Sequence, residues 1–236
     1  MSAEISITKE NLDKYLKELA REFRKLNGTK TPAEIILIGG AAVIANYGFR
    51  EMTNDIDAMI FASSVMKEAI NRVGDRHGLP HGWLNTDFKR TKSFSEKLLQ
   101  FSKYYKTFSN ILDIRTVSAE YLIAMKLMSG REYKYDLSDI AGILLEHDKS
   151  GRPITRNDIH KAVTELYGGW SEIPKNSVEY LETVFADDDY METYIGARGR
   201  EKESKEILLD FDEKYPGELS ADKIEDVIRR ARQKKE

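Results

Sequence analysis

The stretch that decides the fold is Glu34-Ile35-Ile36-Leu37-Ile38-Gly39-Gly40, which Thr53-Asn54-Asp55-Ile56-Asp57 follows further along the chain. Its first five residues form a short apolar run, which is typical of a buried strand. Gly39 and Gly40 have no Cβ, so the backbone can turn sharply there and approach a ligand closely. The small apolar residues 41–45 then favour a helix whose free N–H groups would face a phosphate. The predicted order is therefore strand, glycine turn and helix.

The second part of this signal puts two carboxylates on a strand predicted over residues 55–61. Because side chains alternate along a strand, Asp55 and Asp57 share one face while Ile56 points into the core. Unpaired carboxylates at a buried strand are costly, so we expect a cation beside them. Mg²⁺ or Mn²⁺ fits, because hard cations prefer carboxylate oxygens as ligands. Either part alone is common in turns or at solvated strand edges, and it is their order that predicts a site.

The composition is that of an ordinary globular protein. With 236 residues, the chain is long enough for one large domain or two modest ones. The net charge of −3 provides no global basic field, so any nucleic-acid binding requires a local patch. The absence of cysteine excludes a disulfide scaffold and a Cys-ligated zinc site. Without a long apolar run or a signal-peptide pattern at residues 1–5, we expect a cytoplasmic protein with no membrane partner.

Hydrophobic periodicity and helix-capping residues predict the remaining elements. We expect helices over 9–26, 40–47, 64–76, 119–128, 136–147, 156–167, 198–213 and 220–235, and strands over 34–38, 55–61, 97–106 and 110–117. This order predicts an α+β fold, in which a mixed sheet is flanked by helices and followed by a helical C-terminal region. The predicted domains are a core over 1–117 and a helical region over 118–236, the latter divided into 118–165 and the additional helices of 170–236.

Four separated motifs, in this order, resemble the minimal nucleotidyltransferases of the DUF6036 type, which are related to the toxins of abortive-infection type IV toxin–antitoxin systems. The motifs are Gly39-Gly40 with Thr53-x-Asp55-x-Asp57, the segment Leu79-Pro80-His81-Gly82-Trp83-Leu84-Asn85, residues 117–127, and Arg131-Glu132-Tyr133-Lys134-Tyr135-Asp136-Leu137-Ser138-Asp139-Ile140. Two details depart from the family pattern. Thr86 stands where an Asp is usual, and one residue is inserted between Lys134 and Asp136. The resemblance covers about residues 30–165.

The resemblance implies a nucleotidyltransferase-like fold that moves an NMP from an NTP to an acceptor hydroxyl of RNA, such as a tRNA end, or of a protein. It further implies Mg²⁺ or Mn²⁺ as cofactor and a toxin role with a cognate antitoxin as partner. Gly39, Gly40 and Thr53 would bind the nucleotide, and Asp55 and Asp57 the metal. A third carboxylate often comes from a later strand in such enzymes, and Asp113 is the best candidate. The alternative for Asp113 is a surface ion pair with Arg115.

Three residues after the predicted strands are further candidates. Lys126 lies in an otherwise apolar predicted helix, where it either snorkels to solvent or contacts phosphate as a point charge, and the resemblance favours phosphate. Arg131 would grip a phosphate with two hydrogen bonds. By resemblance, Asp136 would orient Lys126 or accept the proton of the nucleophile. Helix capping explains at least one of Asp136 and Asp139 without any catalytic role.

Basic and aromatic side chains are interleaved over residues 85–106. This pattern indicates either an RNA-facing patch or an amphipathic strand with its aromatic side chains in the core. Two rival functions also remain: a catalytically inactive nucleotidyltransferase-like binding module, and modification of a small molecule such as an aminoglycoside. The lack of a third carboxylate near Asp55 and Asp57 would favour the binding module. A compact acidic pocket would favour the small-molecule substrate.

Overall fold

The structure, a computed structural model, describes residues 6–29, 31–187, 189–220 and 223–233. The chain forms two compact units. The first consists of the residues up to Met125 together with Ile154–Glu172, and the second of Lys126–Pro153 and Ile173–Glu236. Helix α6 (Arg156–Tyr167) belongs to the first unit, and the domain division after residue 117 stays a prediction. The predicted α+β class, with a mixed sheet and a helical C-terminal region, is confirmed.

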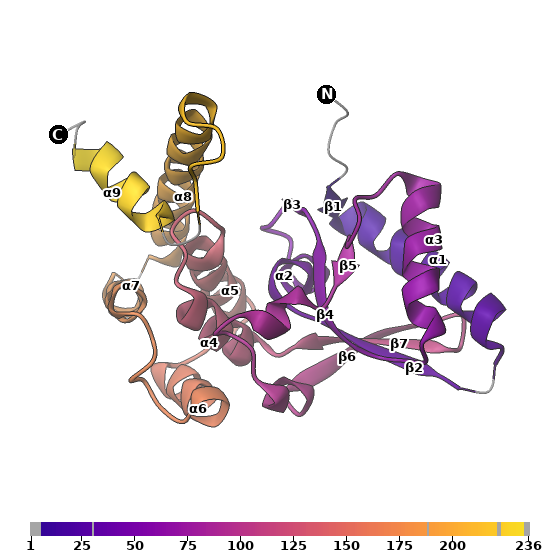
Figure 1. Cartoon of the computed structure of the whole chain (residues 1–236). Coiled ribbons are helices and arrows are strands. Elements are labelled where there is room, and N and C mark those ends of the chain that lie inside the picture. Colours follow the sequence, from indigo (N-terminus) through magenta and orange to yellow (C-terminus); the bar gives the residue numbers. More distant parts are fainter. Residues whose placement is uncertain (1–5, 30, 188, 221–222, 234–236) are drawn as a thin grey trace. The chain divides into compact units, whose positions relative to one another are not determined.

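The first unit is built on a five-stranded sheet with the strand order β5-β4-β2-β7-β6 (Figure 1). Its strands are β2 (Ala33–Leu37), β4 (Ile56–Phe61), β5 (Leu84–Asn85), β6 (Ser102–Phe108) and β7 (Leu112–Val117). Strand β2 runs antiparallel to β4 and parallel to β7, and β6 runs antiparallel to β7. The short strands β1 (Ile7–Thr8) and β3 (Met52–Thr53) form a separate pair.

Helices α1 (Lys9–Asn27) and α3 (Val65–His77) pack against each other in the first unit (Figure 1). Helix α1 buries an apolar stripe at helical spacing, as its sequence predicts. Between the two helices, Glu22 is almost fully buried and accepts hydrogen bonds from Arg72 at 3.1 Å and Arg76 at 3.0 Å. The short helix α2 (Gly39–Asn46) follows β2 directly.

The strand predicted over 97–106 is wrong in its first half. Residues Glu96–Leu99 form the 3₁₀ helix η2, and Asp87–Arg90 form a similar helix, η1. Leu98 is fully buried by this short helix, so an apolar residue here does not require a strand. The turn predicted around Ser109-Asn110 is present, and both residues have positive φ, at 54° and 52°, as a tight hairpin turn requires.

The described part of the second unit is helical. Its elements are the end of α4 (Ala119–Ser129), then α5 (Asp136–Lys149), α7 (Lys175–Ala186), α8 (Tyr190–Lys214) and α9 (Ile224–Gln233). Helix α8 includes the predicted stretch 198–213 and begins at Tyr190, where the Asp189 carboxylate accepts hydrogen bonds from two backbone N–H groups of its first turn. Parts of the helix predicted over 220–235 lie outside the described residues. Across the described chain, every helix is too short or too polar to span a lipid bilayer.

Candidate active site

The glycine turn between β2 and α2 is closely surrounded by polar side chains. Gly39 has a φ of +54°, which glycine adopts without strain, and a Cβ there would lie 3.7 Å from Asp57 Oδ2. A Cβ on Gly40 would come within 2.6 Å of Arg50 Nη2 and 2.7 Å of Thr53 Oγ1. The turn therefore favours glycine at Gly39 because of its positive φ, and at Gly40 because a side chain there would collide with Arg50 and Thr53.

The two carboxylates lie at the start of β4, next to this turn. Asp55 directly precedes the strand and Asp57 is its second residue, and both are half-buried. The backbone N–H of Ile38 donates to the Asp57 carbonyl at 2.9 Å, which ties the start of β4 to the end of β2. Gly39, Gly40, Thr53, Asp55 and Asp57 are thus brought together within the first unit.

Two neighbours of this cluster were missed as site residues by the sequence reasoning. Asn85 of β5 pairs with Asp57, and its Nδ2 donates to Asp55 Oδ2 at 3.3 Å. The Asn85 side chain is itself held, because its Nδ2 also donates to the Gly82 carbonyl at 3.0 Å. Arg50 donates from Nε to the Met52 carbonyl at 3.1 Å. Its signal in the sequence is that it is the only basic residue between the Gly39-Gly40 pair and the Asp55 and Asp57 pair.

Asp113 lies in a different row of the sheet from Asp57, so the structure does not bring it next to the carboxylate pair. In the sheet register, Asp113 pairs with Glu34 of β2, whereas Asp57 lies beside Ile38. Four residues of strand separate these rows, a distance of about 13 Å. The described residues contain no cluster of three or more His, Asp or Glu side chains that could hold a metal. The alternative for Asp113, a surface ion pair with Arg115, is not formed: Thr107 Oγ1 donates to Asp113 Oδ1, and Arg115 Nε donates to Ser102 Oγ at 2.8 Å.

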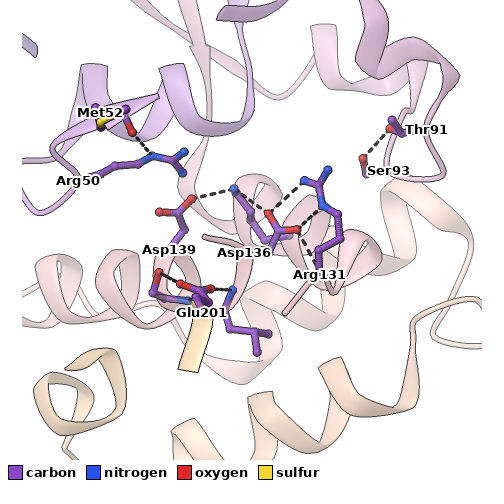
Figure 2. A network of polar contacts seen from close by, with 11 residues as sticks. Arg50, Met52, Thr91, Ser93, Arg131, Asp136, Asp139 and Glu201 are labelled. Carbon is purple, nitrogen blue, oxygen red and sulfur yellow. Dashed lines mark hydrogen bonds and ion pairs between the residues drawn. The ribbon is translucent and has the colours of Figure 1, made fainter. Parts of the chain in front are cut away.

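The other predicted site residues form a buried ion cluster within the second unit (Figure 2). Lys126 Nζ lies 2.9 Å from Asp136 Oδ1 and 2.7 Å from Asp139 Oδ2. Arg131 Nε donates to Asp136 Oδ2 at 2.8 Å. Lys126 is only 6% exposed, so the snorkelling alternative is wrong. Asp136 does contact Lys126, as its predicted orienting role requires.

The cluster keeps Asp136 ionised. Burial alone would raise the pKa of Asp136, but the positive charges of Lys126 and Arg131 outweigh burial and lower this pKa to about 2. A further carboxylate, Glu201 of α8, accepts hydrogen bonds from the backbone N–H of Leu137 and Ser138 beside the cluster (Figure 2). Sequence reasoning missed Glu201, because α8 reads as a solvated helix.

The aromatic residues of 85–106 are mostly packed against the protein. Phe88 is buried, Phe101 stacks on Tyr121 with ring centres 3.9 Å apart, and the Tyr105 hydroxyl donates to Asp13. Tyr104, by contrast, is 63% exposed. The alternative of an amphipathic segment with its aromatic side chains turned inward therefore describes this region better than a continuous stacking patch does.

Comparison with known proteins identifies a family. Residues 14–149 match the family described as "Nucleotidyltransferase of unknown function (DUF6036)". No curated protein and no solved structure matches the chain. The match covers more than half of the chain and includes every site residue predicted from the sequence, whereas Glu201 lies beyond it.

Proposed function

Because this chain belongs to the DUF6036 family of nucleotidyltransferases of unknown function, we propose that it transfers an NMP from an NTP to an acceptor hydroxyl. The observation that carries the proposal is the convergence of Arg50, Thr53 and Asp57 on the Gly39-Gly40 turn at the start of α2. Nucleotidyl transfer depends mainly on positioning and on charge stabilisation around the phosphates. A helix start beside a guanidinium and two carboxylates supplies groups for both.

Asp55 and Asp57 fit a Mg²⁺ or Mn²⁺ ion that arrives with the nucleotide. Mg²⁺ in nucleotide sites is commonly held by one or two protein carboxylates, with water and phosphate oxygens completing the octahedron. When bound, the metal neutralises charge on the phosphates. Asn85 would hold Asp55 in place through its 3.3 Å hydrogen bond, and the Arg50 guanidinium would grip phosphate oxygens.

The finer parts of the proposal rest on the resemblance alone. These are RNA, such as a tRNA end, or a protein as acceptor, a toxin role, and a cognate antitoxin as partner. The contacts of Lys126 and Arg131 with phosphate likewise stay predictions, as does proton acceptance by Asp136.

One observation favours a second candidate, a nucleotide-binding module without catalysis. In the sheet register Asp113 is offset from Asp57 by four residues along the strand direction, about 13 Å, and β2 lies between their strands, so a third carboxylate from β7 would not reach the pair. Two carboxylates are enough to bind a metal-loaded NTP. Activation of an acceptor hydroxyl, however, would then need another base.

The test separates binding from transfer. Titration calorimetry with non-hydrolysable NTP analogues and Mg²⁺ measures binding, and labelled NTPs with total RNA or protein measure transfer. We expect the double variant Asp55→Asn with Asp57→Asn to abolish transfer without changing the circular dichroism spectrum. Asp113→Asn is the matched control and should transfer at the wild-type rate. Wild-type binding without transfer to any acceptor would support the binding module instead, and full transfer by the double variant would overturn the metal assignment.

A further inference from the structure

We propose that Glu201 is a positioning residue for Lys126: it anchors the first turn of α5, whose Asp136 and Asp139 hold the Lys126 ammonium. The inference rests on the proposed function, in which Lys126 contacts the phosphates of the NTP. All of these residues belong to the second unit.

The anchor consists of three hydrogen bonds that a buried carboxylate accepts. Glu201 Oε1 accepts from Leu137 N at 3.0 Å and from Ser138 N at 3.1 Å, and Oε2 accepts from Ser138 Oγ at 2.6 Å. Glu201 is 2% exposed.

Glu201 takes the place of a missing local cap. The first N–H groups of a helix have no partner within the helix, and the residue before the helix usually supplies one. In α5 that residue is Tyr135, which makes no side-chain capping hydrogen bond. Glu201 instead accepts hydrogen bonds from two of these N–H groups from a distant part of the chain.

The anchored residues lie between the two carboxylates that hold Lys126. Leu137 and Ser138 separate Asp136 from Asp139 in the sequence, so a shift of their backbone moves both carboxylates. The turn is also held from α7, because the Tyr180 hydroxyl donates to the Leu137 carbonyl at 2.9 Å. With the anchor in place, Lys126 Nζ keeps its contacts with Asp139 at 2.7 Å and with Asp136 at 2.9 Å.

Ionisation of Glu201 changes the charge around Lys126. Asp136 and Asp139 of α5 and Tyr180 of α7 face Glu201, Arg200 is its neighbour on α8, and Lys126 and Arg131 lie beyond the two aspartates. Burial raises the pKa of Glu201 to about 7; the hydrogen bonds from Ser138 oppose this rise, and the charges of Asp139 and Asp136 add to it. The added negative charge above this pKa should weaken NTP binding as the pH rises from 6 to 8.

The test compares three variants of the full chain. Glu201→Ala removes the anchor, Glu201→Gln keeps an acceptor oxygen but removes the charge, and Glu206→Ala removes an exposed acid of the same helix as a control. We expect hydrogen exchange over residues 131–140 to be faster in Glu201→Ala only. We expect NTP affinity to fall about tenfold in Glu201→Ala, the scale seen for residues that orient metal ligands. In Glu201→Gln, the affinity for NTP should be retained. It should no longer change between pH 6 and 8.

Two further measurements assign the effect to Lys126. In a Lys126→Gln background, Glu201→Ala should cause no further loss of NTP affinity, and a full additional loss would overturn the proposal. Amine labelling followed by mass spectrometry gives a readout that needs no nucleotide. Lys126 should be protected in the wild type and in Glu201→Gln but reactive in Glu201→Ala. If the wild type binds no NTP, the proposed function fails, whereas an unchanged Lys126 labelling rate in Glu201→Ala overturns the positioning role.

Discussion

Replacement of Lys126 by methionine should destabilise the protein markedly. Methionine has a similar apolar stem and a high helix propensity, so a lysine that merely snorkels would tolerate this change or gain stability from it. In the structure, however, Lys126 is the shared cation of Asp136 and Asp139, whose side chains are 1% and 2% exposed. The expectation of unchanged or higher stability, which the sequence alone supports, is therefore reversed.

The size of the stability loss follows from the buried carboxylates that Lys126→Met leaves without their cation. Removal of one partner from a buried ion pair costs about 3–5 kcal/mol, because the remaining charge is buried without compensation. Arg131 still holds Asp136 at 2.8 Å, so we expect a loss near the lower limit, about 3 kcal/mol. For a chain of this size, a loss of that order lowers the melting temperature by roughly 6–12 °C.

Urea unfolding and thermal melting followed by circular dichroism measure this loss. Lys149→Met is the matched control, since Lys149 is an exposed lysine of α5 and should change the unfolding free energy by less than about 0.5 kcal/mol. Adding Asp139→Asn to Lys126→Met should recover part of the lost stability, because one uncompensated charge is removed. Wild-type stability of Lys126→Met would refute the buried ion cluster and the reasoning built on it.

Three further predictions concern the first unit. Gly40→Val should weaken NTP binding more than it lowers the melting temperature, because the new side chain collides with Arg50 and Thr53; unchanged affinity in the folded variant would make the turn purely structural. Asp113→Asn should leave NTP affinity unchanged in calorimetry, and a large loss would restore Asp113 to the site. The hydrogen bond from Arg76 lowers the pKa of Glu22 to about 2, below its ordinary 4.5, although burial opposes this shift. The stability from Glu22 is therefore present above pH 4.5 and is lost as the pH falls toward 2, so the wild-type melting temperature should fall more steeply over this range than that of Glu22→Gln.

The elements around the glycine turn could be predicted because their signals are local. An apolar run, two glycines and a run of small apolar residues specify β2, the turn and α2 within a few residues of one another. The alternation of side chains over residues 55–57 likewise predicted that Asp55 and Asp57 share one face. Arg50 lies in the connection between these elements, and no periodic pattern marks such a residue.

The place of Asp113 could not be predicted, because strand register is a property of two segments and not of one. Alternation shows which face of β7 carries Asp113, and that face is the one that carries Asp57. It does not show which row of the sheet the residue occupies. The parallel pairing of β7 with β2 puts Asp113 in the row of Glu34, at the opposite end of the strand from Gly39.

The role of Glu201 was hidden for a different reason. Helix α8 has charged residues on all sides, so one acid among many gives no sign of burial. Its partners, Leu137 and Ser138, contribute backbone N–H groups, which have no signature in the sequence. Only the packing of α8 against α5 distinguishes Glu201 from its exposed neighbours.

The distance along the chain between α5 and Glu201 has a consequence for protein synthesis. A ribosome releases the α5 segment well before residue 201, so the start of this nascent helix must wait for the first half of α8 before its anchor exists. A translation product that stops short of α8 would carry every residue of the family match and still lack the anchor. The ion cluster around Lys126 would therefore gain its final geometry late in synthesis. Chains that stop before α8 would lack the anchored arrangement of Asp136 and Asp139.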